Sequence, residues 1–391
     1  MVNPRVLLTG SARRPASRGR ERSVIPRKAT VVTLSAALLG LVAALTACSG
    51  PGYRADPAAL EGAPKPVLEL SSPEVTTPDA PDTPGAPDLL DFKHRALIRV
   101  PGGPFLQESA NGASFEHTLS DFEIAKYAVT YELWYEVRSW AEERDPPYQF
   151  ANPGREGSDG VDGASPTDRS HQPATRISWF DAVVWLNAYS ELSGLEPVYR
   201  IEDGTLRDAS HADHSQIVAD WNADGFRLPT EGEWQYAASW RGEANGDGGQ
   251  DAEPREFSGR LWTPPTWASG AAADHRDTEA TGAVAWYMEN SDKHDDATQP
   301  VGTREPNQLG LYDMSGNTWE WTWDWYAEYP EEQQTNYRGP DKPPDGNGCY
   351  RVLRGASVGG AAVLLQVGYR IGFDPANANF NGGVRPARNL K

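Results

Sequence analysis

Two carboxylates, Asp313 and Glu320, lie on either side of a glycine-containing turn in the segment Asp-Met-Ser-Gly-Asn-Thr-Trp-Glu. Such a turn can direct the backbone carbonyls of Gly316 and Thr318 toward the same point as the two side chains. Calcium prefers hard oxygen donors of this kind, which it binds at about 2.3–2.6 Å. The residues therefore predict a structural calcium site formed by Asp313, Gly316, Thr318 and Glu320. The alternative is that both carboxylates accept hydrogen bonds from buried backbone donors of the turn.

Thiol chemistry depends on two cysteines, Cys48 and Cys349, because the chain has no others. Cys48 ends the sequence Leu-Thr-Ala-Cys, which follows a basic stretch and an apolar run over residues 31–45. The run is too short for a stable transmembrane helix. Leu-Thr-Ala-Cys resembles a bacterial lipobox, so we predict a lipoprotein signal peptide over residues 1–47 and a lipid on Cys48. An ordinary signal peptide or a retained membrane anchor is the alternative.

The predicted lipid makes the membrane a partner and places the protein in the bacterial cell envelope, on the outer surface or in the periplasm. With Cys48 lipidated, Cys349 has no partner for an intrachain disulfide, and an all-cysteine zinc site is excluded.

The charge of the chain argues against nucleic acid as a partner. The full sequence carries a formal net charge of −19. Residues 1–47 hold eight Lys or Arg and one acidic residue, a net +7, so the chain from Cys48 onward carries −26. A field of this sign repels phosphate backbones and anionic lipids.

Composition divides the remainder of the chain into a tether and one domain. Residues 48–91 are rich in Pro, Ala and acidic residues and contain too few large apolar side chains to fold, so we predict a disordered tether. The folded domain then spans residues 92–391. With 32 Pro, 38 Gly and 14 Trp in the chain, we expect a loop-rich fold with an aromatic core. The acidic, glycine-rich segments 151–170 and 241–258 are expected to be solvated surface loops.

Three helices have recognisable beginnings. Thr130 is a candidate N-cap for a helix that continues to residue 143. Ser178 and Thr230 each begin a capping box, with Asp181 and Glu233 as the third residue after the cap. We therefore predict two further helices over residues 178–193 and 230–238; the first has an apolar face formed by residues 182, 185, 186, 189 and 192.

Six segments occur in a fixed order along the chain: RVPGGPF (99–105), YAVTYELW (127–134), PATRISWFDAVVWLNAYSELSG (173–194), GFRLPTEGEWQYAAS (225–239), QPVGTREPNQLGLYDMSGNTWEWTWDWY (299–326) and RVLRGAS (351–357). Together they resemble the formylglycine-generating-enzyme family, also called sulfatase-modifying factors. The resemblance implies an irregular α+β fold of the C-type-lectin kind with little regular secondary structure. It also implies that the loop at residues 313–320 is the calcium loop of the family. A second calcium site of the family would fall within residues 284–297, but its ligands have no match there.

Four tryptophans alternate with other residues between Trp319 and Trp325. A period of two places them on one side of an extended segment. Flat indole faces suit sugar rings, so a carbohydrate platform is one interpretation; packing into the core is the other, since the family buries this segment.

The oxidases of the family bind copper with two cysteines located between the RVLRG element and the end of the domain. Here the corresponding residues 356–385 contain no Cys, His or Met. Thiolates suit Cu(I), so we expect no copper and no oxidation of a sulfatase cysteine. Related sulfoxide synthases hold iron with histidines, but His211 and His214, like Asp274-His275 and His294-Asp295, are expected in solvated loops. A copper-free enzyme remains an alternative, because cysteine-free relatives include a pyoverdine-maturation branch.

The C-terminal segment departs most from the family, where aromatic residues flank it at both ends. The protein resembles C-type-lectin-fold lipoproteins whose C-terminal segment is varied by diversity-generating retroelements. This likeness predicts a binding surface for a protein or glycan; a drifted loop is the alternative. The candidate ligand-binding positions are Gly359, Gly360, Val363, Leu365, Gly368, Tyr369, Ile371, Gly372, Phe373, Asp374, Phe380 and Gly382.

Taken together, the sequence predicts a lipid-anchored, ligand-binding protein with a sulfatase-modifying-factor-type domain and no copper chemistry. Two other functions stay open. One is a copper-free enzyme acting on a small molecule or peptide, and the other is a structural component of the cell envelope.

Overall fold

A computed structural model describes residues 95–169, 171–202, 204–210, 216–244, 254–291, 297–344 and 348–390, with the backbone of residues 75–76. Cys48, His211, His214 and the pair His294-Asp295 lie outside the described residues, as do most of the predicted tether and the signal peptide. Among the described residues, no helix combines the length and the apolar character needed to cross a membrane.

The helices are α1 (Tyr131–Glu142), α2 (Trp179–Leu192), α3 (Glu231–Ser239), α4 (Thr278–Val284) and α5 (Met288–Ser291), with a 3-10 turn η4 (Ala362–Leu364). The strands are β1 (Val75–Thr76), β2 (Leu97–Val100), β3 (Gly103–Glu108), β4 (Ser114–Leu119), β5 (Phe122–Ala125), β6 (Arg155–Glu156), β7 (Ala174–Thr175), β8 (Tyr199–Ile201), β9 (Gly204–Thr205), β10 (Ile217–Ala219), β11 (Trp240–Glu243), β12 (Arg255–Phe257), β13 (Arg260–Trp262), β14 (Trp319–Trp325), β15 (Gln334–Thr335), β16 (Arg351–Arg354), β17 (Ile371–Phe373), β18 (Gly382–Gly383) and β19 (Ala387–Asn389).

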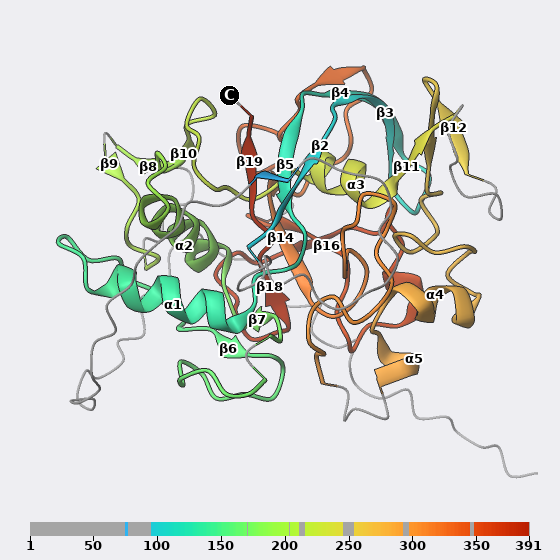
Figure 1. The fold of residues 1–391 in the computed structure, drawn as a ribbon. Helices are drawn as coiled ribbons and strands as arrows, with labels where there is room; N and C mark the ends of the chain where they lie inside the picture. Colours follow the sequence, from blue (N-terminus) through green and yellow to red (C-terminus); the bar gives the residue numbers. More distant parts are fainter. Residues whose placement is uncertain are drawn as a thin grey trace, which may run out of the picture. The chain divides into compact units, whose positions relative to one another are not determined.

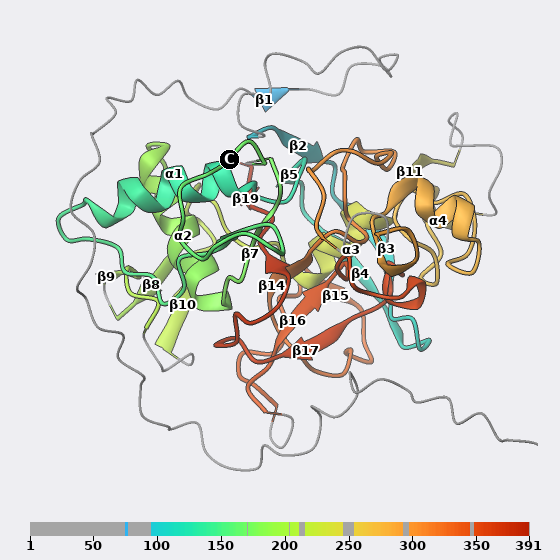
Figure 2. The same ribbon diagram turned by 90° about the horizontal axis from the view of Figure 1, so that it is seen from below.

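Short strands form several small sheets, and long loops connect them (Figure 1). One four-stranded sheet has the order β1-β2-β5-β19, so the last strand of the domain pairs antiparallel with β5 near its beginning. Another has the order β17-β16-β14-β18, and Figure 2 shows its strands β14, β16 and β17 beside one another. The predicted α+β class with little regular secondary structure is confirmed.

The three predicted helices are confirmed as α1, α2 and α3. The side chains of Thr130, Ser178 and Thr230 each accept a hydrogen bond from the backbone N–H three residues further on. In α2 and α3 the reciprocal bond from the cap backbone to the third residue is also present, so both capping boxes form. Gly194 follows α2 with φ of 72°, a left-handed conformation that glycine adopts without strain.

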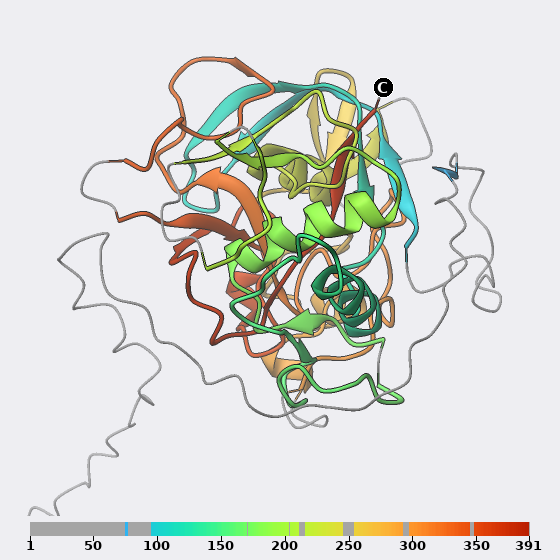
Figure 3. The same ribbon diagram turned by 90° about the vertical axis from the view of Figure 1, so that its left-hand side faces the viewer.

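Helix α2 is buried on nearly every side, which corrects the prediction of a single apolar face. Val183 and Val184 lie outside the predicted face and are fully buried. Trp185 stacks on Trp134 of α1 with ring centroids 5.3 Å apart, and Figure 3 shows the two helices adjacent. A helix that is covered all round loses its amphipathic pattern because it packs inside the protein.

The two segments predicted as solvated loops are only partly so. Part of segment 241–258 belongs to β11 and β12, which flank β13 in a three-stranded sheet. In segment 151–170, Glu156 is buried and its carboxylate accepts hydrogen bonds from the backbone and hydroxyl of Thr167. An acidic side chain can be buried when other residues of the chain satisfy its hydrogen bonds. Composition alone therefore gave a wrong prediction of solvent exposure for part of these segments.

The alternating tryptophans belong to the core, which confirms the packing interpretation over a carbohydrate platform. Trp321 is fully buried, and its indole N–H donates to the carbonyl of Ile177. Trp323 stacks on Tyr199, with ring centroids 5.4 Å apart. The pairing of β14 with β16 shifts register between Trp321 and Trp325, so the strict alternation expected from the sequence is interrupted.

Candidate functional site

A cavity of about 440 Å³ lies where four loops meet, and we call it the C-terminal pocket. Its walls come from segments around residues 109–113, 266–276, 326–329 and 363–370, which are far apart in the sequence. The lining residues are Ser109, Ala110, Asn111, Ala113, Thr266, His275, Arg276, Tyr326, Glu328, Tyr329, Val363, Gln366, Gly368, Tyr369 and Arg370. Aromatic rings beside polar groups make this a surface suited to a specific ligand.

Three tyrosines contribute aromatic rings and hydroxyl groups to the pocket wall. Tyr329 donates its hydroxyl to Glu231, with 3.3 Å between the oxygens, and burial raises its pKa to about 12. The hydroxyls of Tyr326 and Tyr369 form no hydrogen bond with any residue that the structure describes. Burial also raises the pKa of Tyr369, so its phenol is neutral at physiological pH. The hydroxyl groups of these two half-buried rings are therefore available to form hydrogen bonds with a ligand.

Arg370 fixes one side of the pocket to the helix beneath it. Its guanidinium donates to both carboxylate oxygens of Glu231 at 2.6 and 2.8 Å and lies 4.6 Å from the Tyr326 ring centroid. Burial works against ionisation of Glu231, but Arg370 and Arg354 hold the pKa of that carboxyl below its usual value. Because Glu231 is the first residue of α3, the loop that carries Arg370 is attached to a buried helix end.

Asp324 extends this buried network. Its Oδ2 accepts the backbone N–H of Glu231 at 2.7 Å. Burial, reinforced by the charge of Glu231, raises the pKa of Asp324 to about 8. The carboxyl is therefore mostly protonated at neutral pH, and only one of the two acids beneath the pocket is charged.

His275 forms part of the pocket wall, which corrects the prediction of a solvated loop. Its Nδ1 lies 3.0 Å from the carbonyl of Thr266 and 2.9 Å from the side-chain amide of Gln366. Asp274 lies 3.2 Å from the same nitrogen. Gln366 comes from the C-terminal segment, so the contact that removes His275 from solvent is one that local sequence cannot reveal.

Of the predicted ligand-binding positions, Val363, Gly368 and Tyr369 line the pocket. Val363 is 47% exposed. Gly359 and Asp374 are exposed but are not part of the pocket lining.

The strand β17 holds Ile371, Gly372 and Phe373 against β16. A Cβ atom added at Gly372 would approach the Tyr326 ring to 2.7 Å, so this glycine is required by close packing. Phe373 packs against Phe380, and their ring centroids are 4.5 Å apart. None of these four positions lines the pocket, although Gly372 packs against Tyr326, which does.

Three other predicted positions lie inside the protein, so the structure corrects their assignment to a binding surface. Leu365 is fully buried and packs with Ala268 and Ala356. Gly360 is buried beside the 3-10 turn, and Gly382 is buried where its Cβ would meet the ring of Phe380. The sequence of this segment lacks a clear period, which is why buried and exposed positions could not be separated in advance.

The loop at residues 313–320 is dense with internal contacts. Glu320 and Arg385 are both fully buried and form an ion pair at 2.7 Å. The other carboxylate oxygen of Glu320 accepts the indole N–H of Trp234 at 2.7 Å. Arg385 donates further hydrogen bonds to the carbonyls of Ala125 and Tyr312. Glu320 thus already has a buried counterion.

Asp313, unlike Glu320, has a carboxylate oxygen without a partner among the described residues. It adopts φ of 55°, and its Oδ2 accepts the backbone N–H of Gly302 at 2.8 Å. Its Oδ1 is buried and has no hydrogen-bond partner among the described residues. Burial raises the pKa of Asp313 to about 6. This orphaned oxygen fits a cation ligand, whereas Glu320 fits only if the cation shares that carboxylate with Arg385.

The remaining predicted calcium donors are backbone carbonyls. The carbonyl of Gly316 accepts the N–H of Thr318 at 2.8 Å, which folds the turn tightly. In the part of the chain that the structure describes, no three His, Cys, Asp or Glu side chains cluster closely enough to hold a metal ion. A calcium ion in this loop would therefore depend on the two carbonyls for half of its protein donors. Residues 292–296 of the second expected site lie outside the described residues.

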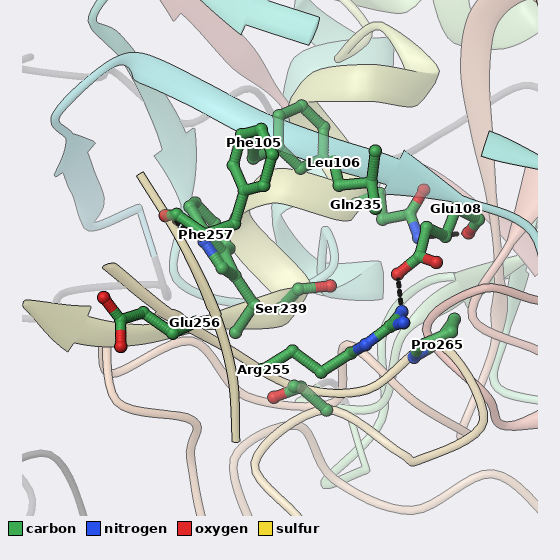
Figure 4. Close-up of a pocket in the computed structure, with 11 residues that line it drawn as sticks. Phe105, Leu106, Glu108, Gln235, Ser239, Arg255, Glu256, Phe257 and Pro265 are labelled. Carbon is green, nitrogen blue, oxygen red and sulfur yellow. Dashed lines mark hydrogen bonds and ion pairs between the residues drawn. The ribbon is translucent and has the colours of Figure 1, made fainter. Parts of the chain in front are cut away.

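A smaller cavity of about 120 Å³ is lined by residues of β3, α3, β12 and β13 (Figure 4). An ion pair between Glu108 and Arg255 spans it, and the rings of Phe105 and Phe257 form part of its lining. Because Glu108 and Arg255 pair with each other, Glu256 is the remaining charged side chain of its lining, and the cavity offers a ligand less than the larger C-terminal pocket does.

The fold and its loop-built pocket define a C-type-lectin-like domain of the formylglycine-generating-enzyme type. Residues 87–390 match the family described as sulfatase-modifying factor enzyme 1-like domain, and the chain belongs to this family. It is 31% identical over 296 residues to "Chaperone protein LppX" of Paenibacillus barcinonensis, covering 75% of this chain and 89% of that protein.

Two further relatives bear on function. The formylglycine-generating enzyme of Streptomyces coelicolor is 31% identical over 172 residues, which cover 41% of this chain and 47% of that enzyme. Among solved structures, "Treponema denticola variable protein 1" is 27% identical with a TM-score of 0.56, covering 75% of this chain and 95% of that chain. The similarity to the enzyme thus spans less than half of its length, whereas the other two relatives match over most of theirs.

Sequence reasoning missed most of the pocket. Tyr326, Glu328 and Tyr329 continue the aromatic run after Trp325, and that excess of rings was the available signal. Asn111 carries no comparable signal, because only the tertiary fold brings the β3–β4 hairpin to the C-terminal segment.

Proposed function

We propose that this protein is a non-catalytic binding protein of the cell envelope that holds its ligand in the C-terminal pocket. The observation that carries the proposal is that Tyr326 and Tyr369 line a cavity of about 440 Å³ with hydroxyls that have no hydrogen-bond partner among the described residues. Tyrosine supplies a large contact area at a low entropic cost, and the Ser, Asn and Gly residues around it supply adaptable polar contacts.

A protein segment is the ligand class we favour over a glycan. Support comes from the relative named as a chaperone protein, which aligns over 89% of its length. Its name implies a protein client, and a tyrosine-lined pocket suits a peptide as well as it suits a sugar. Chaperone-like binding of an exported protein is therefore our leading form of the proposal.

We further propose that Val363 and Tyr369 are positions of natural diversity. Support comes from the likeness to the Treponema variable protein and from the position of both residues on the pocket wall. Sequencing the 3′ end of the gene in sibling strains tests this. Substitutions concentrated at these two codons, beside a template repeat and a reverse transcriptase gene, are expected; a uniform 3′ end would contradict it.

Lipidation of Cys48 places the pocket at a membrane surface in this proposal. The supporting feature is the Leu-Thr-Ala-Cys sequence after a basic and apolar leader. Mass spectrometry of the mature N-terminus is expected to find a diacylated cysteine, and Cys48→Ala is expected to release the protein from membranes. An unmodified Cys48 in the mature protein would remove the anchor from the proposal.

The binding experiment compares two tyrosines. Full-length protein is tested against a peptide array of exported proteins and against a glycan array, and the best probe of each is titrated. Tyr369→Ala should weaken binding of the true ligand by about tenfold or more, as expected for a central aromatic contact. Tyr350→Ala, at an exposed tyrosine that does not line the pocket, is the matched control and should leave affinity unchanged. Equal effects of the two variants would exclude the pocket.

The second candidate is a copper-free enzyme, which the family relationship to the Streptomyces enzyme supports. Incubation with a sulfatase-derived cysteine peptide separates the two functions. We expect no change in peptide mass. Conversion of the cysteine to an aldehyde by purified, tag-free protein would overturn the non-catalytic proposal.

Calcium is proposed as a structural ion of the loop at residues 313–320. The support is the buried Oδ1 of Asp313, which has no hydrogen-bond partner among the described residues, and the presence of Gly316 and Thr318 a few residues further along the same loop. The ion would supply the positive charge that Asp313 lacks and would steady the turn, without taking part in a reaction.

A further inference from the structure

A third cavity, of about 220 Å³, lies beside the last residues of the described chain and is lined mainly by polar groups. It shares no lining residue with the C-terminal pocket. Two arginines, Arg227 and Arg338, reach into its lining, and both guanidinium groups lie over the ring of Trp221. We call this cavity the Trp221 cavity.

Arg227 is fully engaged inside the protein. Its guanidinium forms a bidentate pair with Glu233 at 2.6 and 2.7 Å. It also donates to the side-chain carbonyl oxygen of Asn389 at 2.8 Å. These bonds neutralise the charge of Arg227 and fix its plane, so Arg227 has little capacity left for a ligand.

Arg338 has the opposite character. Its central carbon lies 4.0 Å from the ring centroid of Trp221, yet its guanidinium forms no hydrogen bond or ion pair with any described residue. Burial, together with the nearby charge of Arg227, lowers the pKa of Arg338. Glu233 and Asp324 favour the charged form of Arg338 from a distance, but neither forms an ion pair or a hydrogen bond with it. Among the described residues, the half-buried guanidinium therefore has no direct acceptor.

The two acids that line the cavity, Asp121 and Glu233, form no direct ion pair with Arg338. Asp121 is paired with Arg99 at 2.9 Å, and its Oδ1 accepts the backbone N–H of Gly102. Glu233 is committed to Arg227. Both acids are hydrogen-bonded to other groups, so the charge of Glu233 acts on Arg338 only from a distance and the N–H donors of Arg338 have no direct acceptor among the described residues.

The segment that carries Arg338 is held in place by its neighbours. The side chain of Asn336 accepts the backbone N–H of Ser120 at 2.8 Å and donates to its hydroxyl at 3.0 Å. The backbone N–H of Tyr337 donates to Nε2 of the buried His117 at 2.9 Å. Strand β15 pairs with β4 just before these residues. Arg338 is thus presented by an ordered segment and not by a free loop.

We propose that the Trp221 cavity binds an oxyanion, a carboxylate or a phosphate, through the in-plane N–H donors of Arg338. An arginine stacked on an aromatic ring keeps its planar N–H edge available, and that edge matches two oxygens of a carboxylate or phosphate. A cavity of about 220 Å³ admits an anionic group of a few heavy atoms and not a whole folded partner. The site is separate from the function proposed for the C-terminal pocket and does not depend on it.

Calorimetric titration of the full chain with inorganic phosphate and, separately, with acetate tests the proposal. Saturable binding of at least one anion, with a Kd of about 1 mM or tighter, is expected. Arg338→Gln should weaken that binding by about tenfold or more, because a charge-assisted bidentate contact is lost. Arg144→Gln is the matched control, because Arg144 is an exposed arginine that also stacks on a tryptophan, Trp140, and lines neither the Trp221 cavity nor the C-terminal pocket; it should change nothing.

Arg338→Lys is a second variant that distinguishes a loss of binding from a folding defect. Lysine keeps the charge but lacks the planar fork, so its affinity is expected between wild type and Arg338→Gln at an unchanged melting temperature. Binding of phosphate alone or of acetate alone would support the site and define the oxyanion. Absence of binding for both anions, or an equal affinity of wild type and Arg338→Gln, would overturn it.

Discussion

The loop at residues 313–320 and the C-terminal pocket differ in how completely their polar groups are satisfied. In the loop, Glu320 has Arg385 and Trp234 as partners inside the core. In the pocket, the hydroxyls of Tyr326 and Tyr369 have no partner among the described residues. The loop carries the most recognisable motif of the chain, and the pocket carries none.

The comparison shows that the most recognisable motif of this chain consists of residues that stabilise the fold. The charged side chains of the loop at residues 313–320 form hydrogen bonds and ion pairs inside the protein, except for one carboxylate oxygen of Asp313. Binding capacity resides where polar groups remain unpaired at a cavity, and those groups come from segments with weak sequence signals. The following predictions test this contrast, beginning with the largest effect.

Glu320→Ala should lower the free energy of unfolding by about 3–5 kcal/mol, because it leaves the guanidinium of Arg385 buried without a counterion. Urea denaturation measures the effect, with Glu328→Ala at the exposed edge of the pocket as a control expected within about 0.5 kcal/mol. If Glu320 also binds calcium, the loss is larger in calcium than in chelator. An equal loss in both would remove Glu320 from the calcium site.

Leu365→Asn and Val363→Asn separate buried from exposed positions within one short segment. We expect a loss of about 3 kcal/mol or more at Leu365, where a cavity and an unsatisfied amide replace a fully buried side chain. At the exposed Val363 the change should stay within about 0.5 kcal/mol. Similar melting temperatures for the two variants would show that Leu365 is not part of the core.

Asp313→Asn tests the partnerless carboxyl of the loop. The folded pKa of Asp313 is raised to about 6 from 3.8, so the folded state binds the proton more tightly than the unfolded chain does. Stability should therefore fall as the pH rises from about 4 to about 6, by about 2–3 kcal/mol. Asp313→Asn should remove this slope in chelator. Calcium bound to wild type should also flatten it, and a slope unchanged by calcium would count against the ion.

Tyr369→Phe should have the smallest effect on stability, about 0.5 kcal/mol or less, because the hydroxyl that it removes has no hydrogen-bond partner in the part of the chain that the structure describes. Affinity for the ligand should nevertheless fall by several-fold, the loss expected when one hydrogen bond to a ligand is removed. Thermal denaturation and titration of the same sample give both values. A large loss of stability would reveal an internal contact of this hydroxyl.

The sequence by itself determined the features that depend on near neighbours. The N-caps Thr130, Ser178 and Thr230 act on backbone groups three residues away, so their helices could be predicted with nearly correct ends. The ordered family segments likewise determined the fold class, and the absence of Cys from residues 356–385 is the basis of the prediction that the protein binds no copper.

Only the tertiary structure decided which polar groups remain available. Arg385 meets Glu320 across 65 residues, and Gln366 meets His275 across 91. No local pattern encodes such contacts, because they arise when distant loops pack around a shared core. The same packing places Leu365 inside and Val363 outside although they are two residues apart. Pairing across the fold, and not residue type, therefore decides where a ligand can bind.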